Sequence, residues 1–195
     1  TVSADQLLLT GNPYPSALNA YAFINDNLNS VDRFEDVGLD GTIYFWEHSS
    51  NNNTHILKDY LGGYSVLNLS GGLPPVVPDL ISGVGLSNKI PKQHIPVGQG
   101  FFVYGKTGGG GTVIFNNGQR AFQKETDATS NTLFKIKAKA KTENAWDTNA
   151  NDPIQKDTLK RIRLGFNSSN NFHRQVLLAF MQEKATSAID YGYDG

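Results

Sequence analysis

The chain has 195 residues, enough for one large domain or two closely merged small ones. Charged residues make up 18% of it, below the roughly 25% of typical domains, and 20 glycines accompany many Asn-rich loops. The net charge of -1 excludes a global electrostatic surface for nucleic acid or an anionic membrane. The absence of cysteine excludes a disulfide framework and a thiol nucleophile, and no run of about 18 apolar residues is present to span a bilayer.

The first element is an apolar stretch that ends in TGNPYPS (10–16), followed by ALNAYAFINDN (17–27). Pro13 and Pro15 lack amide donors and keep the preceding residues extended, so the strand must end there, and one of the two X–Pro bonds is a candidate for the cis form. Ser16 is predicted to cap a short helix with Leu18, Tyr21, Ala22 and Asn25 on one stripe. Tyr14 is expected to be a packing anchor, with a ligand contact as the alternative.

A strand is predicted next, because the Asp40-Gly41 turn precedes the aromatic and β-branched segment 42–48. On this strand Tyr44 and Trp46 share one face, and Ile43 and Phe45 share the other. An exposed Tyr44/Trp46 face would form a platform able to stack on a sugar ring, whereas a buried one would be core. Because both faces look apolar, the pattern favours core.

The segment GFFVYGKT (100–107) fits the phosphate-binding template G-x-x-x-x-G-K-T letter for letter. Its middle residues favour a strand, and the glycines that follow cannot begin the helix that a phosphate loop needs. We therefore interpret it as a strand end. The segments 94–106 and 111–122, joined by Gly-rich residues, predict a hairpin.

The second half of the chain alternates with a period of two. In NTLFKIKAKAK (131–141) apolar residues alternate with lysines, which are interpreted as the solvated face of a strand rather than a polyanion site. RIRLGF (161–166) alternates in the same way, and NFHRQVLLAF (171–180) is the last long strand. About eight strands, one helix and no βαβ rhythm predict a mostly β fold in residues 1–195, an antiparallel β-sandwich of jelly-roll type.

Two loops are candidates for metal binding. His48 and His55 flank one loop, with Glu47 and Asp59 nearby, but the spacing fits no zinc template, so solvated histidines are the favoured interpretation. Residues 146–157 place oxygen ligands at nearly alternate positions, as calcium loops do, although the Gly and Glu of an EF-hand are missing. The calcium candidates are Asp147, Asn149, Asn151 and Asp152, with weaker support for Asp190 and Asp194; an Asx-turn loop is the alternative. Trp146 on this loop is expected to be exposed and is the preferred aromatic ligand contact.

Catalysis has little support in the sequence. Hydrolysis by paired carboxylates is open to Glu35, Asp36, Glu47 and Asp59, but no spacing selects a pair. No G-x-S-x-G nucleophile signature is present.

An ordered set of phrases resembles a region found in large secreted and surface-anchored proteins of the Bacteroidota. It lies there just upstream of the C-terminal sorting domain that the type IX secretion system reads. The phrases are LLTGNPYPSALNAYAFINDN, DGTIYFWEH, GGYSVLNLSGG, IPVGQGFFV, GTVIFNNGQRAF, RIRLGFNSSNNFHRQVLLAF and AIDYGYDG. The resemblance implies an exported, adhesin-like or enzyme-associated module, and it brings no catalytic residues. Since such chains continue past the last phrase, it also implies a piece cut near Gly195.

These observations predict a non-catalytic secreted or cell-surface module that binds carbohydrate or mediates adhesion, with calcium rigidifying a loop. Trp146, Trp46, Tyr44 and Tyr14 are its ligand-binding candidates, and its expected partners are a polysaccharide and neighbouring domains of a larger precursor, without nucleic acid. A structural spacer that presents neighbouring domains is the alternative. A glycan-active enzyme ranks third.

Overall fold

A computed structural model describes residues 1–28, 38–48, 55–59, 62–75, 90–123, 159–169, 173–181 and 185–194. Within them lie one α-helix, two short 3-10 helices and twelve strands, and all strand pairs are antiparallel. The elements are β1 Val2–Ser3, β2 Leu7–Gly11, β3 Ala17–Asn19, α1 Ala20–Asn27, β4 Leu39–His48, η1 Leu57–Asp59, β5 Gly62–Asn68, β6 Gly71–Leu73, β7 His94–Ile95, β8 Gly100–Gly105, β9 Gly110–Gly111, η2 Asn117–Gln119, β10 Arg120–Ala121, β11 Lys160–Asn167 and β12 His173–Phe180. The predicted mostly β, antiparallel class is confirmed, whereas the pairings do not establish a jelly roll.

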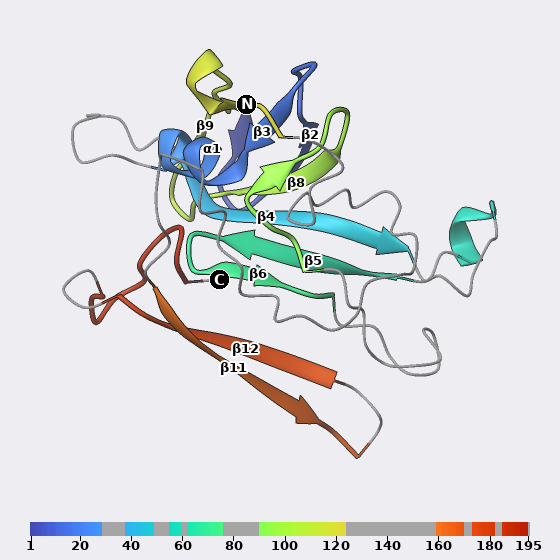
Figure 1. The fold of residues 1–195 in the computed structure, drawn as a ribbon, viewed down its shortest axis with the longest axis vertical. Helices are drawn as coiled ribbons and strands as arrows, with labels where there is room; N and C mark the ends of the chain where they lie inside the picture. The colour runs from blue at the N-terminus through green and yellow to red at the C-terminus, as the bar shows by residue number, and fades with distance from the viewer. Residues whose placement is uncertain are drawn as a thin grey trace.

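The largest sheet has five strands in the order β2-β8-β4-β5-β6. A small sheet of order β10-β3-β7 and helix α1 lie against one of its faces, and the hairpin β11–β12 lies beyond β6 (Figure 1). The predicted strand at 131–141 lies outside the described residues.

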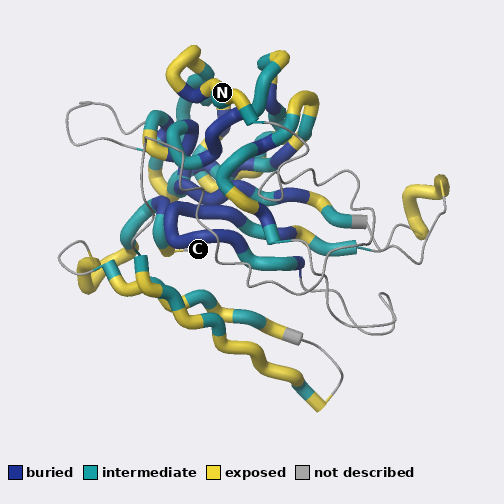
Figure 2. Tube along the Cα trace, in the orientation of Figure 1, coloured by how far each residue is buried: buried dark blue, intermediate teal, exposed yellow. Residues whose placement is uncertain are grey.

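The core forms between the inner face of the five-stranded sheet and the α1/β3/β7 layer, where Figure 2 shows the buried residues gathered. Phe45 and Phe101 project from the sheet, and Phe23 projects from the helix to meet the Phe101 ring edge-on at 5.5 Å. Such edge-to-face pairs add stabilisation beyond the area they bury. The fully buried apolar side chains include Leu18, Phe23, Ile24, Ile43, Phe45, Leu67, Ile95, Phe101 and Val103.

The TGNPYPS segment is a corner built around the buried Asn12 side chain. Its amide nitrogen donates to the carbonyl oxygens of Ser16 (2.8 Å), Pro96 (3.1 Å) and Ile95 (3.2 Å), and its oxygen accepts from the Tyr14 amide at 3.0 Å. One side chain thus joins the corner to Ile95 in β7, 83 residues away in sequence. No described peptide bond is cis, so the cis-proline prediction is wrong for this corner.

The helix begins three residues later than predicted, and its cap is Asn19 rather than Ser16. The Asn19 side chain accepts hydrogen bonds from the amides of Tyr21 and Ala22, and its backbone is extended, as an N-cap requires. The residues from Ala17 to Asn19 instead form β3, which pairs with both β7 and β10. The buried helix face consists of Ala20, Phe23, Ile24 and Asn27, so the predicted stripe through Tyr21, Ala22 and Asn25 is also wrong.

The segment resembling a phosphate loop is a strand, as predicted. Residues 100–105 form β8, which pairs with β2 on one side and β4 on the other. The predicted hairpin is wrong, because the glycines after β8 lead to β9, which pairs with β1 at the N-terminus. These glycines tolerate the positive φ angles of Gly108, Gly110 and Gly111, which carry the chain away from β8.

Residues of the C-terminal DYGYDG segment form hydrogen bonds with the turn after β5. The Leu69 amide donates to the Gly192 carbonyl at 2.7 Å, and Asn68 and Ser70 side chains both donate to the Tyr193 carbonyl at 3.0 Å. Gly192 has a φ of 84°, and a Cβ there would lie 2.7 Å from a Leu28 methyl carbon. Residues 190–194 therefore belong to the folded body, and the positive φ of Gly192 favours glycine at that position.

We expect Asn12→Ala to lower the free energy of unfolding by roughly 2 kcal/mol or more, because buried carbonyls at the corner lose their donor. Urea titration would measure the loss. Asn12→Asp keeps the shape but turns a carboxylate toward three carbonyl oxygens, so it should destabilise the fold at pH 7 and do so less in acid. The exposed Asn117→Ala is the matched control, and equal stability of all four proteins would contradict the role given to Asn12.

Candidate functional site

The outer face of the five-stranded sheet carries a continuous apolar surface. Direct cross-strand pairs connect one residue from every strand in a single row: Leu9, Phe102, Tyr44, Val66 and Leu73. A second pair, Trp46 with Tyr64, lies on the same face because side chains repeat every two residues along a strand. Five aromatic rings lie on this outer face, and we call them the aromatic platform: Tyr44, Trp46, Tyr64, Phe102 and Tyr104.

The preference for core is wrong for Trp46, which is exposed, whereas Tyr44 is half-buried. Trp46 is 41% exposed and Tyr64 is 45% exposed, while Ile43 and Phe45 on the other face are 1% and 2% exposed. The reason is that the α1/β3/β7 layer packs on the Ile43/Phe45 face only. The alternative interpretation, an open platform, describes the position of Trp46, with the half-buried Tyr44 on the same face.

Ring contacts fix the geometry of the platform. The Trp46 and Tyr64 centroids are 5.0 Å apart with an interplanar angle of 66°, and the Tyr64 and Phe102 centroids are 5.8 Å apart at 83°. Both pairs have the edge-to-face arrangement that aromatic quadrupoles favour. The three rings therefore support one another from β4, β5 and β8, which holds an apolar surface in place before any ligand arrives.

The platform has a polar end near the start of β4. Burial raises the pKa of the Asp40 carboxyl above its ordinary value of 3.8, against the lowering effect of a hydrogen bond from the Thr42 amide at 2.8 Å. Burial, and then the nearby Asp40 charge, also raise the pKa of Tyr44. The Tyr44 hydroxyl therefore stays protonated at neutral pH and can both donate and accept hydrogen bonds.

Tyr14 is not part of this surface. It packs against the core cluster, with its ring 6.4 Å from that of Phe115 at an interplanar angle of 74°, and the Arg120 guanidinium lies 5.6 Å from its centroid. Phe115 in turn packs against Phe23 on the covered side of the sheet. The structure thus assigns Tyr14 to packing and does not bring it together with Tyr44 and Trp46.

The other predicted aromatic contact and the calcium loop lie outside the described residues. These are Trp146, Asp147, Asn149, Asn151 and Asp152. Among the residues that the structure does describe, no three His, Cys, Asp or Glu side chains group as a metal site would require. His55 is exposed, which agrees with its interpretation as a solvated loop residue.

The weaker calcium candidates, Asp190 and Asp194, serve the C-terminal turn. The Asp190 carboxylate accepts from the Thr186 hydroxyl at 2.6 Å and from the Thr186 amide at 2.8 Å, which lowers its pKa. The Asp194 carboxylate accepts from the Asp190 amide at 2.9 Å. Both carboxylates thus accept hydrogen bonds from groups four residues earlier in the chain, as local side-chain contacts of a turn do.

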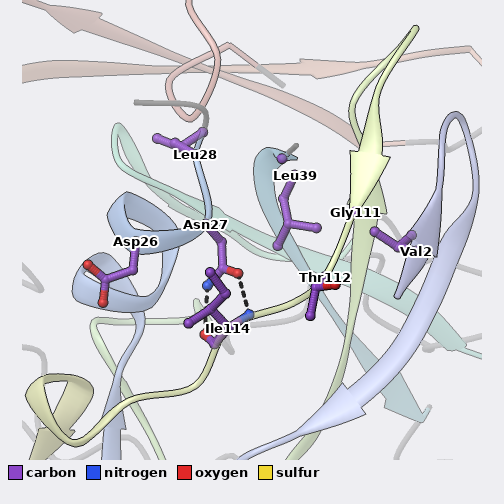
Figure 3. Close-up of a pocket in the computed structure, with 9 residues that line it drawn as sticks. Val2, Asp26, Asn27, Leu28, Leu39, Gly111, Thr112 and Ile114 are labelled. Carbon is purple, nitrogen blue, oxygen red and sulfur yellow. Dashed lines mark hydrogen bonds between the residues drawn. The ribbon is translucent and has the colours of Figure 1, made fainter. Parts of the chain in front are cut away.

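A small cavity between the end of α1 and β9 offers little room for a ligand. Its volume is about 30 Å³, compared with about 300 Å³ or more in typical ligand pockets. At its wall the Asn27 side chain accepts from the Ile114 amide at 2.7 Å and donates to the Ile114 carbonyl at 3.0 Å, replacing a strand partner (Figure 3). The amide oxygen and nitrogen of Asn27 are therefore used in hydrogen bonds that stabilise the fold.

Three platform residues were missed by the sequence: Tyr64, Phe102 and Tyr104. Phe102 and Tyr104 lie in the strand predicted within 94–106, and Tyr64 lies in the GGYSVLNLSGG phrase. The residue types there do not mark the exposed face, because residues 101 and 102 are both phenylalanine and the polar Ser65, not Tyr64, is buried. What the alternation alone could not supply was the strand order that brings β5 and β8 to either side of β4.

The fold and its open surface define an antiparallel β protein with an aromatic sheet face, and no described helix is long and apolar enough to cross a membrane. Comparison with known families assigns the chain to one of them. Residues 1–195 match the family described as "Domain of unknown function (DUF8693)", and the chain belongs to that family. No match was found among curated proteins or among solved structures.

The raised pKa of Asp40 predicts a specific pH dependence of stability. Because the folded state disfavours the carboxylate, this group stabilises the fold most below pH 3.8, and that contribution is lost as the pH rises through the higher folded pKa. Asp40→Asn retains an oxygen that can accept from the Thr42 amide but cannot ionise. Its stability relative to the wild type should therefore increase from about pH 3 to pH 7, measured by urea unfolding across that range. A constant difference between the two proteins would show that Asp40 has no raised pKa.

Proposed function

We propose that this protein is a non-catalytic module of a secreted or cell-surface protein that binds carbohydrate through the aromatic platform. The observation that carries this proposal is the preformed row of three rings across three adjacent strands, with Trp46 and Tyr64 exposed and Phe102 half-buried beside them. An apolar surface of this kind on a folded protein marks a site of interaction.

The chemistry of a sugar ring suits this surface. A pyranose presents an apolar face of C–H groups and a rim of hydroxyls, so it needs an aromatic ring beneath it and hydrogen-bonding groups beside it. The platform supplies exposed rings at Trp46 and Tyr64, and Tyr44 with Asp40 supplies polar groups at its end. The aromatic surface favours a polysaccharide lying across the sheet.

Export is supported by the resemblance of the ordered phrases to a region of type IX-secreted proteins of the Bacteroidota. Two of these phrases, GGYSVLNLSGG and DYGYDG, are hydrogen-bonded to each other through Asn68, Ser70 and Tyr193. The calcium site at Asp147, Asn149, Asn151 and Asp152 stays a prediction, since those residues are not described.

The alternative function, a structural spacer that presents neighbouring domains, is favoured by one feature of the same surface. Leu7 and Leu9, at the β2 edge of the sheet, are 57% and 63% exposed beside the rings. Exposed leucines have no hydrogen-bonding group for a sugar but can be buried by a protein surface, so a neighbouring domain would cover both groups together.

Trp46→Ala should weaken binding to an insoluble or arrayed polysaccharide about ten-fold, because one exposed ring loses its stacking contact. Tyr64→Ala should have a similar effect, since it also removes the edge support of Trp46 and Phe102. Pull-down depletion curves against a polysaccharide panel would measure the change.

Phe122→Ala is the matched control, because Phe122 is 88% exposed and lies in the segment after β10, outside the platform. Binding that is equal in the wild type and the Trp46 variant, or absent for every glycan, would contradict the platform as a sugar site. Loss of binding in all three variants would point to a general effect instead of the platform.

A further inference from the structure

The hairpin β11–β12 has an apolar face that is open in the described part of the molecule. Its cross-strand pairs include Ile162 with Leu178 and Leu164 with Val176, and Phe166 and Phe180 lie at opposite ends. These six side chains are between 46% and 66% exposed. A two-stranded ribbon is marginally stable by itself, so an uncovered apolar face on one is unusual.

The opposite face of the hairpin is turned toward the body and is partly polar. The Arg161 side chain donates to the Ser70 carbonyl oxygen, and a Cβ on Gly71 in β6 would lie 3.2 Å from a Leu177 methyl carbon. Arg163 shares this side, and burial, followed by the Arg161 charge, lowers its pKa. The hairpin is thus attached through its more polar side and presents its apolar side outward; Figure 2 shows exposed and half-buried positions along both of its strands.

The open face repeats itself across a local two-fold axis. In β11 the outward residues are Lys160, Ile162, Leu164 and Phe166, and in β12 they are Arg174, Val176, Leu178 and Phe180. Both strands therefore read cation, β-branched residue, leucine, phenylalanine. The pairing register places Lys160 opposite Phe180 and Arg174 opposite Phe166, so each end of the face has one cation and one ring.

We propose that this face binds the same face of a second copy of the chain, forming a two-layer sandwich of four strands. When two such faces are stacked about a two-fold axis in the plane between them, each cation comes to lie over a phenylalanine of the other copy. The cation and the ring alternate around the four corners of the face, which are the ends of the two strands. A two-fold axis along the strands, or one across them, therefore brings each cation onto a ring. Cation–ring contact is favourable, and the leucines and β-branched residues close the centre.

The same observations disfavour a lipid surface as the occupant. A sheet with unpaired edges cannot enter hydrocarbon without leaving backbone groups unsatisfied, and in the described part of the chain β11 and β12 pair only with each other. The net charge of -1 also gives no long-range attraction to an anionic bilayer, while a charge near zero allows self-association.

The face is small compared with the roughly 800 Å² per partner of a stable interface, so the dimer should be weak, with a dissociation constant on the order of 10 to 100 µM. Sedimentation velocity over roughly 1 to 300 µM should show a monomer converting to a dimer. Leu164→Gln with Leu178→Gln should raise the dissociation constant at least about ten-fold. The control pair, Ile56→Gln with Leu57→Gln, changes exposed residues at η1 and should leave it unchanged.

Cross-linking provides a test that does not rely on weakening the protein. Because the chain has no cysteine, Leu164→Cys introduces a single thiol near the centre of the face, and a short bis-maleimide should join two copies there. Leu57→Cys, also exposed, should cross-link far less. A wild type that stays monomeric to the highest concentration, or a dimer untouched by the Leu164/Leu178 change, would overturn the proposal. So would a monomer that instead co-sediments with phosphatidylglycerol vesicles through this face.

Discussion

Side chains along β4 alternate between two sides of a sheet, and both sides carry large apolar groups. Ile43 and Phe45 point toward the α1/β3/β7 layer and are buried, whereas Tyr44 and Trp46 point the other way. The described part of the chain supplies one covering layer for this sheet. The core forms on the face that this layer covers, and the other face is left exposed.

That covering layer is positioned by asparagine side chains that act as substitutes for backbone partners. Asn12 ties the corner before β3 to the β7 segment, Asn19 begins the helix, and Asn27 pairs with Ile114 as a strand residue would. All three are at most 7% exposed, and their hydrogen bonds satisfy groups that would otherwise be costly to bury. A layer made of very short strands needs such fixed contacts, because β3 and β7 contribute only two ladder pairs to each other.

The strands were predictable from the sequence because their signal is local. The segments that form β4, β5, β8, β11 and β12 combine β-branched and aromatic residues with turn residues at their ends. The roles of Asn12, Asn19 and Asn27 were not, since an asparagine in a hairpin loop and one buried at a corner look alike in sequence. The cap was assigned to Ser16 for this reason: a hydroxyl after two prolines satisfies the local rule, while the tertiary pairing of β3 decides where the helix begins.

Alternation predicts which residues of a strand share a face, but not which face is buried. A period of two separates Tyr44 from Phe45 and Leu164 from Arg163, but it does not state which set is covered. In β4 the more aromatic set is the open one, and in β11 the apolar set is open while the arginines face the body. Both outcomes arise from contacts distant in sequence, the α1 layer in one case and the β6 turn in the other. The two open faces therefore follow from the same limit, that alternation defines two surfaces and only the rest of the fold decides which of them meets solvent.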